Sequence, residues 1–275
     1  MADTVELSAA IRSNLLTLSR TSDLIEQTQS RLSTGLRVSS ALDDAAAFFA
    51  ARGLTNRAND LSALKDNIDQ GISTIEAAIN GIEAITELIE QAKGLAITAK
   101  ATGDTNERSS LAVQFNALLT QIDSLANDSS FGGTNLLQAS PDNLTVTFNE
   151  DGSSALTISG IDTSTATSGL NVAGATNNFA GDTDINNAIT SVNVALTTLR
   201  SNAATLGSNA TVLQTRLNFT EDLVNTLVSG AGKLTLADLN EESANLLALQ
   251  TRQQLGINSL SLAAQSERSI LALFG

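Results

Sequence analysis

Apolar side chains recur along residues 185–217 at intervals that alternate strictly between four and three residues. Because an α-helix has about 3.6 residues per turn, this spacing puts all of them on one face of a single long helix. A narrow apolar stripe cannot be buried by the helix that carries it, so the segment must pack against partner helices. The stripe consists of Ile185, Ile189, Val192, Leu196, Leu199, Ala203, Leu206, Ala210, Leu213 and Leu217.

A second long stripe lies in the first half of the chain, where an apolar residue recurs every seven positions over residues 61–89. This repeat predicts a helix that can pair antiparallel with the segment described above. Ser40 followed by Asp43 resembles a capping box that opens this helix, and Gly103–Asp104 predicts the turn that follows it. The inner seam is expected to consist of Ile68, Ile75, Ile82 and Ile89 together with Leu196, Leu199, Leu206 and Leu213.

The outermost segments carry apolar stripes of their own. Gly230–Gly232 is expected to stop the preceding helix, and a last helix should follow it. Two helices cannot bury wide stripes by themselves, so this terminal pair is expected to become fully ordered only when other copies complete its core. The expected assembly core consists of Leu7, Ile11, Leu18, Ile25 and Leu32 near the N-terminus, and of Leu239, Leu246, Leu249, Ile257, Leu260, Leu271 and Phe274 near the C-terminus.

The middle of the chain differs in composition. Residues 139–184 are rich in Ser, Thr, Gly and Asn, carry six acidic side chains and contain no Lys or Arg. Leu144, Val146 and Phe148 alternate with polar residues, and a turn-forming stretch separates them from Leu156 and Ile158, which predicts a β-hairpin. We expect a small, acidic, solvent-facing insert.

The predicted fold is therefore mainly α. It is a long antiparallel helical bundle or coiled coil formed by the N- and C-terminal segments, with a small β-containing central insert. The expected organisation is a terminal helix pair over residues 1–40 and 236–275, an inner helical-bundle domain over 41–138 and 185–235, and a surface-exposed variable insert over 139–184.

Composition excludes several classes of function. The net charge of −14 argues against binding to nucleic acid or to an anionic membrane surface, since both require clustered basic residues. The chain contains neither His nor Cys, so triads that depend on these residues are impossible. The first residues have no basic and apolar regions of the kind found in a cleaved secretory signal. We expect no catalysis, no cofactor and no metal.

Three short patterns resemble sites but have simpler explanations. Gly230–Lys233 is similar to part of a phosphate-binding loop, but Leu234 stands where that motif has Ser or Thr, so helix termination is preferred. Asp182 and Asp184 are spaced as in a calcium loop whose turn Gly and closing Glu are missing here. The neighbouring acids Asp43–Asp44 and Glu241–Glu242 fall at expected helix starts, where carboxylates complement the helix dipole.

Two blocks at opposite ends of the sequence resemble bacterial flagellins. The first spans residues 29–82 and includes Leu32-Ser33-Thr34-Gly35-Leu36-Arg37-Val38-Ser39-Ser40-Ala41-Leu42-Asp43-Asp44-Ala45-Ala46. The second spans residues 241–275 and includes Gln250-Thr251-Arg252-Gln253-Gln254-Leu255-Gly256. A shorter match is Phe131-Gly132-Gly133-Thr134-Asn135-Leu136-Leu137. The short middle is similar to that of alphaproteobacterial flagellins.

The resemblance implies a structural subunit that self-assembles into the extracellular filament used for swimming. It implies a terminal helix pair that lines the filament channel, and export through the flagellar type III apparatus. Its implied partners are other flagellin subunits and paralogues, hook-associated junction and cap proteins, and an export chaperone. Glu90 and Ala92 fall where immune-stimulating members carry two arginines, which implies weakened recognition by the flagellin-sensing Toll-like receptor.

Three other classes of protein are alternatives. A flagellar hook–filament junction protein has similar ends, but the block at Arg252–Gly256 favours a flagellin. A signalling coiled coil of the chemoreceptor type would lack the acidic insert and normally carries a membrane segment. A helical enzyme is disfavoured by the lack of His and Cys.

Overall fold

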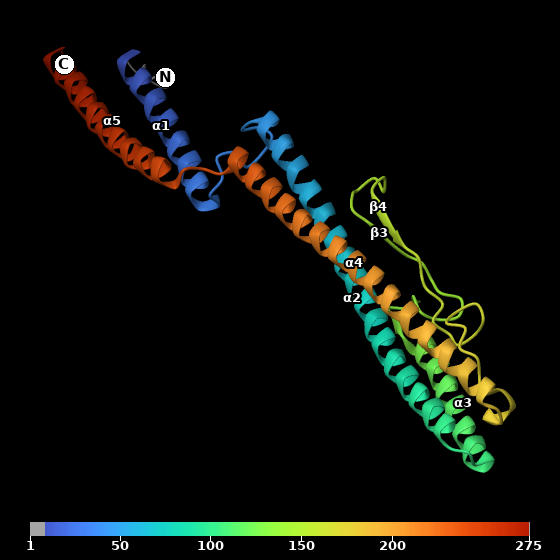
Figure 1. The fold of residues 1–275 in the computed structure, drawn as a ribbon. Helices are drawn as coiled ribbons and strands as arrows, with labels where there is room; N and C mark the ends of the chain where they lie inside the picture. Colours follow the sequence, from blue (N-terminus) through green and yellow to red (C-terminus); the bar gives the residue numbers. More distant parts are fainter. Residues whose placement is uncertain (1–8, 275) are drawn as a thin grey trace, which may run out of the picture. The chain divides into compact units, whose positions relative to one another are not determined.

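The computed structural model describes residues 9–274, and helices dominate it (Figure 1). The mainly α fold with a small β-containing insert is therefore confirmed. The helices are α1 (Ala9–Thr34), α2 (Ala45–Ala101), α3 (Thr105–Asp128), α4 (Asp182–Thr235) and α5 (Leu239–Phe274), with a short 3-10 helix η1 at Thr176–Phe179. The strands are β1 (Ser130–Phe131), β2 (Thr134–Asn135), β3 (Leu144–Thr147) and β4 (Ala155–Ile158), which form two antiparallel pairs.

The chain forms two compact units. One contains the residues up to Arg57 together with those from Thr226 onward, and the other contains Ala58–Asn225. The division lies inside α2, after Arg57, and inside α4, before Thr226. The first turns of α2 lie next to the last turns of α4, where Gly230 faces Leu54, and residues of both segments line one groove together with Leu36 and Val38 of a linker.

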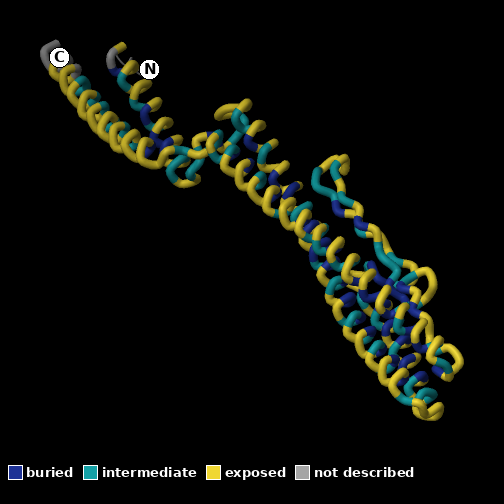
Figure 2. Tube along the Cα trace, in the orientation of Figure 1, coloured by how far each residue is buried: buried dark blue, intermediate teal, exposed yellow. Residues whose placement is uncertain are grey.

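The second unit has a continuous apolar core along three helices. In Figure 2, buried positions run along the facing sides of α2, α3 and α4. Small alanines alternate with branched and aromatic side chains, which lets the helices approach closely. All eight residues named for the inner seam are buried in this one cluster: Ile68, Ile75, Ile82, Ile89, Leu196, Leu199, Leu206 and Leu213.

The insert contains the expected hairpin, with Leu144 opposite Ile158 in the β3–β4 register. It is not a separate module, because Val146 and Ile158 are buried in the same core as the helices. A Cβ atom at Gly71 of α2 would come within 2.7 Å of Val146 Cγ2, so the hairpin packs on helix backbone at that point. Farther along the insert, the ring of Phe179 meets Phe115 of α3 edge-on, with centroids 5.4 Å apart.

Two helix ends differ from the sequence-based expectation. The cap of α2 is Asp44, whose Oδ1 accepts a hydrogen bond from the Ala47 amide at 3.0 Å, while Ser40 and Asp43 form a separate turn before the helix. At the other end, α4 continues through Gly230 and Gly232 to Thr235. Glycine weakens a helix by only about 1 kcal/mol, and tertiary packing overrides this cost: a Cβ atom at Gly230 would lie 3.4 Å from Leu54 of α2.

Candidate assembly surface

Helices α1 and α5 pack along each other within the first unit. On α1, Ile11 and Ile25 are buried, while Leu18 and Leu32 are half-buried. On α5, Leu246, Leu249 and Leu260 are half-buried, and Leu239 and Ile257 are exposed. Of the other residues named for the assembly core, Leu7 and the side chains of Leu271 and Phe274 lie outside the described residues.

Helix α5 is unusual in what it buries. Among its described side chains, only Glu242 is buried, and its carboxylate Oε1 accepts a hydrogen bond from Arg31 Nη1 of α1 at 3.0 Å. No leucine of α5 with a described side chain is buried. The pair therefore presents a row of large apolar side chains to solvent: Leu15, Leu16 and Leu24 on α1, and Leu239, Leu247, Leu255, Ile257 and Leu262 on α5.

The two linkers that lead to α1 and α5 are tied to each other by their backbones. Leu36 and Leu236 form an antiparallel bridge. The Arg37 amide donates to the Thr235 carbonyl at 2.7 Å, and the Ala237 amide donates to the Gly35 carbonyl at 3.0 Å. Gly35 has φ +69°, a conformation that favours glycine and that ends α1. The terminal pair is thus anchored through paired linkers and not through two independent ones.

The two residues expected to alter receptor recognition, Glu90 and Ala92, lie on different faces of α2. Glu90 is exposed, whereas Ala92 is fully buried in the core of the second unit. A buried methyl group cannot contact a receptor in this fold, so Ala92 is not available for the role that the sequence suggested. The neighbouring residues Glu90 and Gln91 are both exposed.

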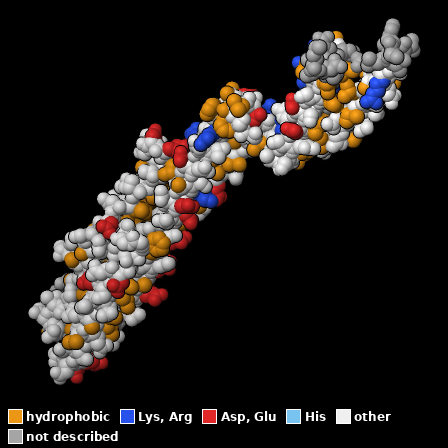
Figure 3. Space-filling model, turned by 180° about the vertical axis from the view of Figure 1, so that it is seen from behind, with side chains coloured by type: hydrophobic (Ala, Val, Ile, Leu, Met, Phe, Trp, Pro, Cys, Tyr) orange, Lys and Arg blue, Asp and Glu red, His pale blue; other side chains and the backbone are white. Residues whose placement is uncertain are grey.

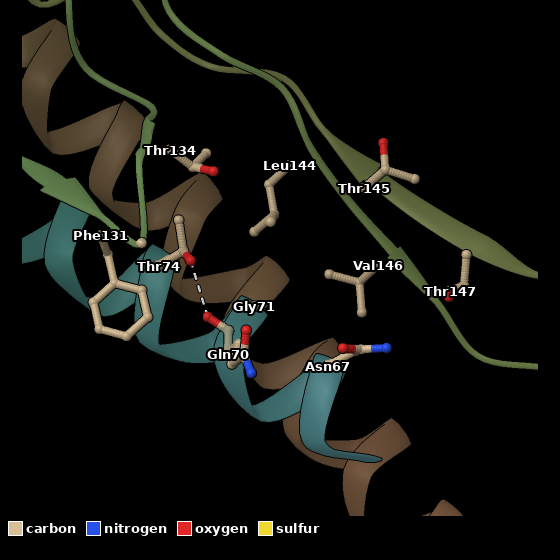
Figure 4. Close-up of a pocket in the computed structure, with 11 residues that line it drawn as sticks. Asn67, Gln70, Gly71, Thr74, Phe131, Thr134, Leu144, Thr145, Val146 and Thr147 are labelled. Carbon is tan, nitrogen blue, oxygen red and sulfur yellow. Dashed lines mark hydrogen bonds between the residues drawn. The ribbon is translucent and has the colours of Figure 1, made fainter. Parts of the chain in front are cut away.

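Another candidate for a binding site is a small hollow in the second unit. It has a volume of about 250 Å³ and lies between α2, the β1–β2 turn and β3 (Figure 4). Its lining offers amides and hydroxyls from Asn67, Gln70, Thr74 and Thr145, but no ionisable side chain. Within residues 9–274, no group of three or more acidic side chains is placed to hold a metal ion. The helices of this part of the chain also contain no apolar stretch that could span a bilayer.

Comparison with known proteins decides between the remaining classes. Residues 6–142 match the bacterial flagellin N-terminal helical region, and residues 189–274 match the bacterial flagellin C-terminal helical region. The chain belongs to the bacterial flagellin family. This family supplies the subunits of the flagellar filament, so the chain is a filament structural subunit, and neither the junction protein nor the signalling coiled coil is favoured.

Named relatives cover nearly the whole chain. Flagellin FljK of Caulobacter vibrioides is 34% identical over 99% of this chain and 98% of its own length. A flagellin of Brucella melitensis is 33% identical over 100% of this chain and 99% of its own length. Both relatives are alphaproteobacterial, as the resemblance of the short insert suggested. A crystal structure of Bacillus cereus flagellin matches 56% of this chain and 88% of that chain, with a TM-score of 0.49 and 20% identity.

Proposed function

We propose that this filament subunit polymerises by burying the outer face of its terminal helix pair against other copies, and that it has no catalytic role. In this proposal, residues 1–40 and 236–275 form the channel-lining core, and residues 41–138 and 185–235 form the surrounding shell. The insert at 139–184 faces outward. We further propose that the subunit leaves the cell through the flagellar type III apparatus with the help of an export chaperone. In the extracellular filament, its proposed partners are hook-associated junction and cap proteins.

The observation that carries the proposal is the apolar exposure of α5. Helix α5 is 36 residues long, and its leucines with described side chains are at best half-buried, so it gains little from packing in a single chain. Leu247, Leu255 and Leu262 are each more than three-fifths exposed. Each such side chain contributes about 1.5–3 kcal/mol when another subunit removes it from water. Together these side chains strongly favour polymerisation, but they contribute little to the folding stability of the monomer.

The Arg31–Glu242 ion pair supports the same view from another direction. Replacing a buried pair with apolar residues is often neutral or stabilising, so such a pair is better explained by specificity than by stability. Here it fixes which turn of α1 faces which turn of α5. The pair therefore presents its exposed leucines in one defined register, which repeated subunit contacts require.

The proposal is tested by growing filaments from purified protein. We expect electron microscopy to show long filaments from the full chain. A chain that lacks residues 236–275 should form none, because it has lost α5. Its circular dichroism should still show a cooperatively melting helical core, since the second unit does not depend on α5. A truncated chain that forms normal filaments would contradict the proposal.

A further inference from the structure

Leu42 lies in the linker before α2 with its side chain 99% exposed. Full exposure of a leucine in an ordered turn is unusual, since burying this side chain stabilises a fold by about 1.5–3 kcal/mol. The exposure is not the result of a loose loop. The Asp43 carboxylate Oδ2 accepts hydrogen bonds from the amides of Ser39 and Ser40 at 3.1 and 2.9 Å, and from both of their hydroxyls. The turn therefore holds Leu42 out into solvent.

An apolar groove lies in the same unit, between the first turns of α2 and the last turns of α4. It has a volume of about 460 Å³, and its lining includes Val38, Phe48, Ala51, Val228 and Ala231. Leu42 of the same chain does not fill it, because that side chain is almost fully exposed. Figure 3 shows hydrophobic side chains gathered where α2 begins. Val38, Ala51 and Ala231 are buried, whereas Phe48 is half-buried and Val228 is 54% exposed. Leu42 and the exposed part of this groove are thus two apolar surfaces on one unit that the chain itself does not cover.

The charges around the two surfaces are complementary. Asp43 and Asp44 follow Leu42 directly, and both are exposed. Arg52, also exposed, is part of the groove lining. A leucine entering the groove from another chain would bring two carboxylates towards this guanidinium. Opposite charges around an apolar contact steer the approach and fix its orientation.

We propose that the occupant of the groove is Leu42 from a second copy of this chain. Because Leu42 and the groove are different surfaces, the contact is heterologous. A pair of subunits therefore keeps one free Leu42 on one copy and one free groove on the other. Such a contact generates an open helical array when its rotation does not close. The proposal rests on the proposed function, and it adds a named contact outside the terminal helix pair.

The first test measures the lowest protein concentration at which filaments grow. Leu42→Ser should raise this concentration on the order of tenfold, which corresponds to about 1.4 kcal/mol per contact. The melting temperature of the monomer should not change, because Leu42 packs against nothing there. Val113→Ser is the matched control, since Val113 is also an exposed apolar residue but lies on α3, outside the groove. Equal growth of Leu42→Ser and the unmodified chain would overturn the proposal.

The second test asks whether Leu42 of one copy lies in the groove of another. The chain contains no cysteine, so introduced thiols can pair only with each other. A chain with Leu42→Cys and Val228→Cys should give a ladder of covalent oligomers when its filaments are oxidised and run on a denaturing gel. A chain with Leu42→Cys and Val113→Cys should not. If the first pair gives no ladder, Leu42 does not occupy this groove. Failure of the unmodified chain to polymerise would overturn the proposed function itself, and this contact with it.

Discussion

Arg31 of α1 and Glu242 of α5 form an ion pair with a distance of 3.0 Å between Nη1 and Oε1, and Glu242 retains only 7% of its exposure. These residues are far apart in sequence, and their pairing joins the first and last described helices. The surrounding leucines are less buried than the carboxylate. The terminal pair is therefore aligned by a polar contact, while its apolar surface remains available.

Glu242→Gln should weaken filament growth. It leaves the Arg31 guanidinium partly buried without its counter-charge, which typically costs about 1–3 kcal/mol. The critical concentration for growth is the measurement. Glu221→Gln provides the control, because the Lys65–Glu221 pair has the same 3.0 Å distance but is exposed, and exposed pairs contribute about 0–1 kcal/mol. Equal effects of the two variants would mean that burial of Glu242 does not matter.

Leu206→Ala and Leu260→Ala should affect different equilibria. Leu206 is buried in the core of the second unit, so its truncation should destabilise the monomer by about 2–5 kcal/mol. Leu260 is half-buried on α5, so its truncation should chiefly raise the critical concentration. Thermal melting of the monomer and a growth assay separate the two effects. Similar losses of monomer stability in both variants would show that α5 is fully packed before assembly.

Two glycines of α2 should respond in opposite directions to alanine. Gly71→Ala places a methyl group 2.7 Å from Val146, so it should lift the hairpin and cost about 1–3 kcal/mol. Gly94 has open space around it, and Gly94→Ala should stabilise the helix by about 0.5–1 kcal/mol. Urea unfolding of the monomer measures both. A stabilised Gly71→Ala variant would be inconsistent with hairpin packing on α2.

The turn that presents Leu42 should depend on pH. Hydrogen bonds from the Ser40 backbone and the Ser39 hydroxyl lower the pKa of the Asp43 carboxyl from its ordinary value of 3.8. A lowered folded-state pKa means that the stabilisation is present above pH 3.8 and is lost as the pH falls through the lower value. The amide resonances of Ser39 and Ser40 should therefore shift only below pH 3.8. In Asp43→Asn this titration should be absent.

Arginine substitutions at Glu90 and Ala92 should differ in their effect on the stability of the monomer. Ala92→Arg should destabilise the monomer strongly, because it forces a guanidinium into an apolar core. Glu90→Arg should leave the melting temperature nearly unchanged, since Glu90 is exposed.

We expect the unmodified monomer to activate the flagellin-sensing Toll-like receptor weakly. A strong response in a receptor reporter assay would refute that expectation.

Periodicity in the sequence was informative where helices bury long faces. The repeats through Ile68–Ile89 and Leu196–Leu213 identified buried positions because each seam has its partner within the chain. Local signals failed where tertiary packing competes with them. Gly230 and Gly232 predicted a helix stop, yet α4 continues through both glycines, and Gly230 lies against Leu54 of α2.

Features without periodicity could not be predicted in the same way. Ser40 and Asp43 suggested a helix cap, but Asp44 takes that role, and residue types alone do not distinguish adjacent acids. The resemblance that singled out Ala92 carried no information on which face of α2 this residue occupies. The exposure of Leu42 also needed coordinates, since a single leucine beside two acids has no distinctive pattern.

The bridge between Leu36 and Leu236 has a consequence for biosynthesis. About 200 residues separate its two strands, and ribosomes add about 5–20 residues per second. Helix α1 therefore emerges about 10–40 s before the linker to which its own linker is paired. During that interval no native partner exists for its apolar face. The apolar face of α1 therefore stays without its partner α5 until synthesis of the chain is nearly complete.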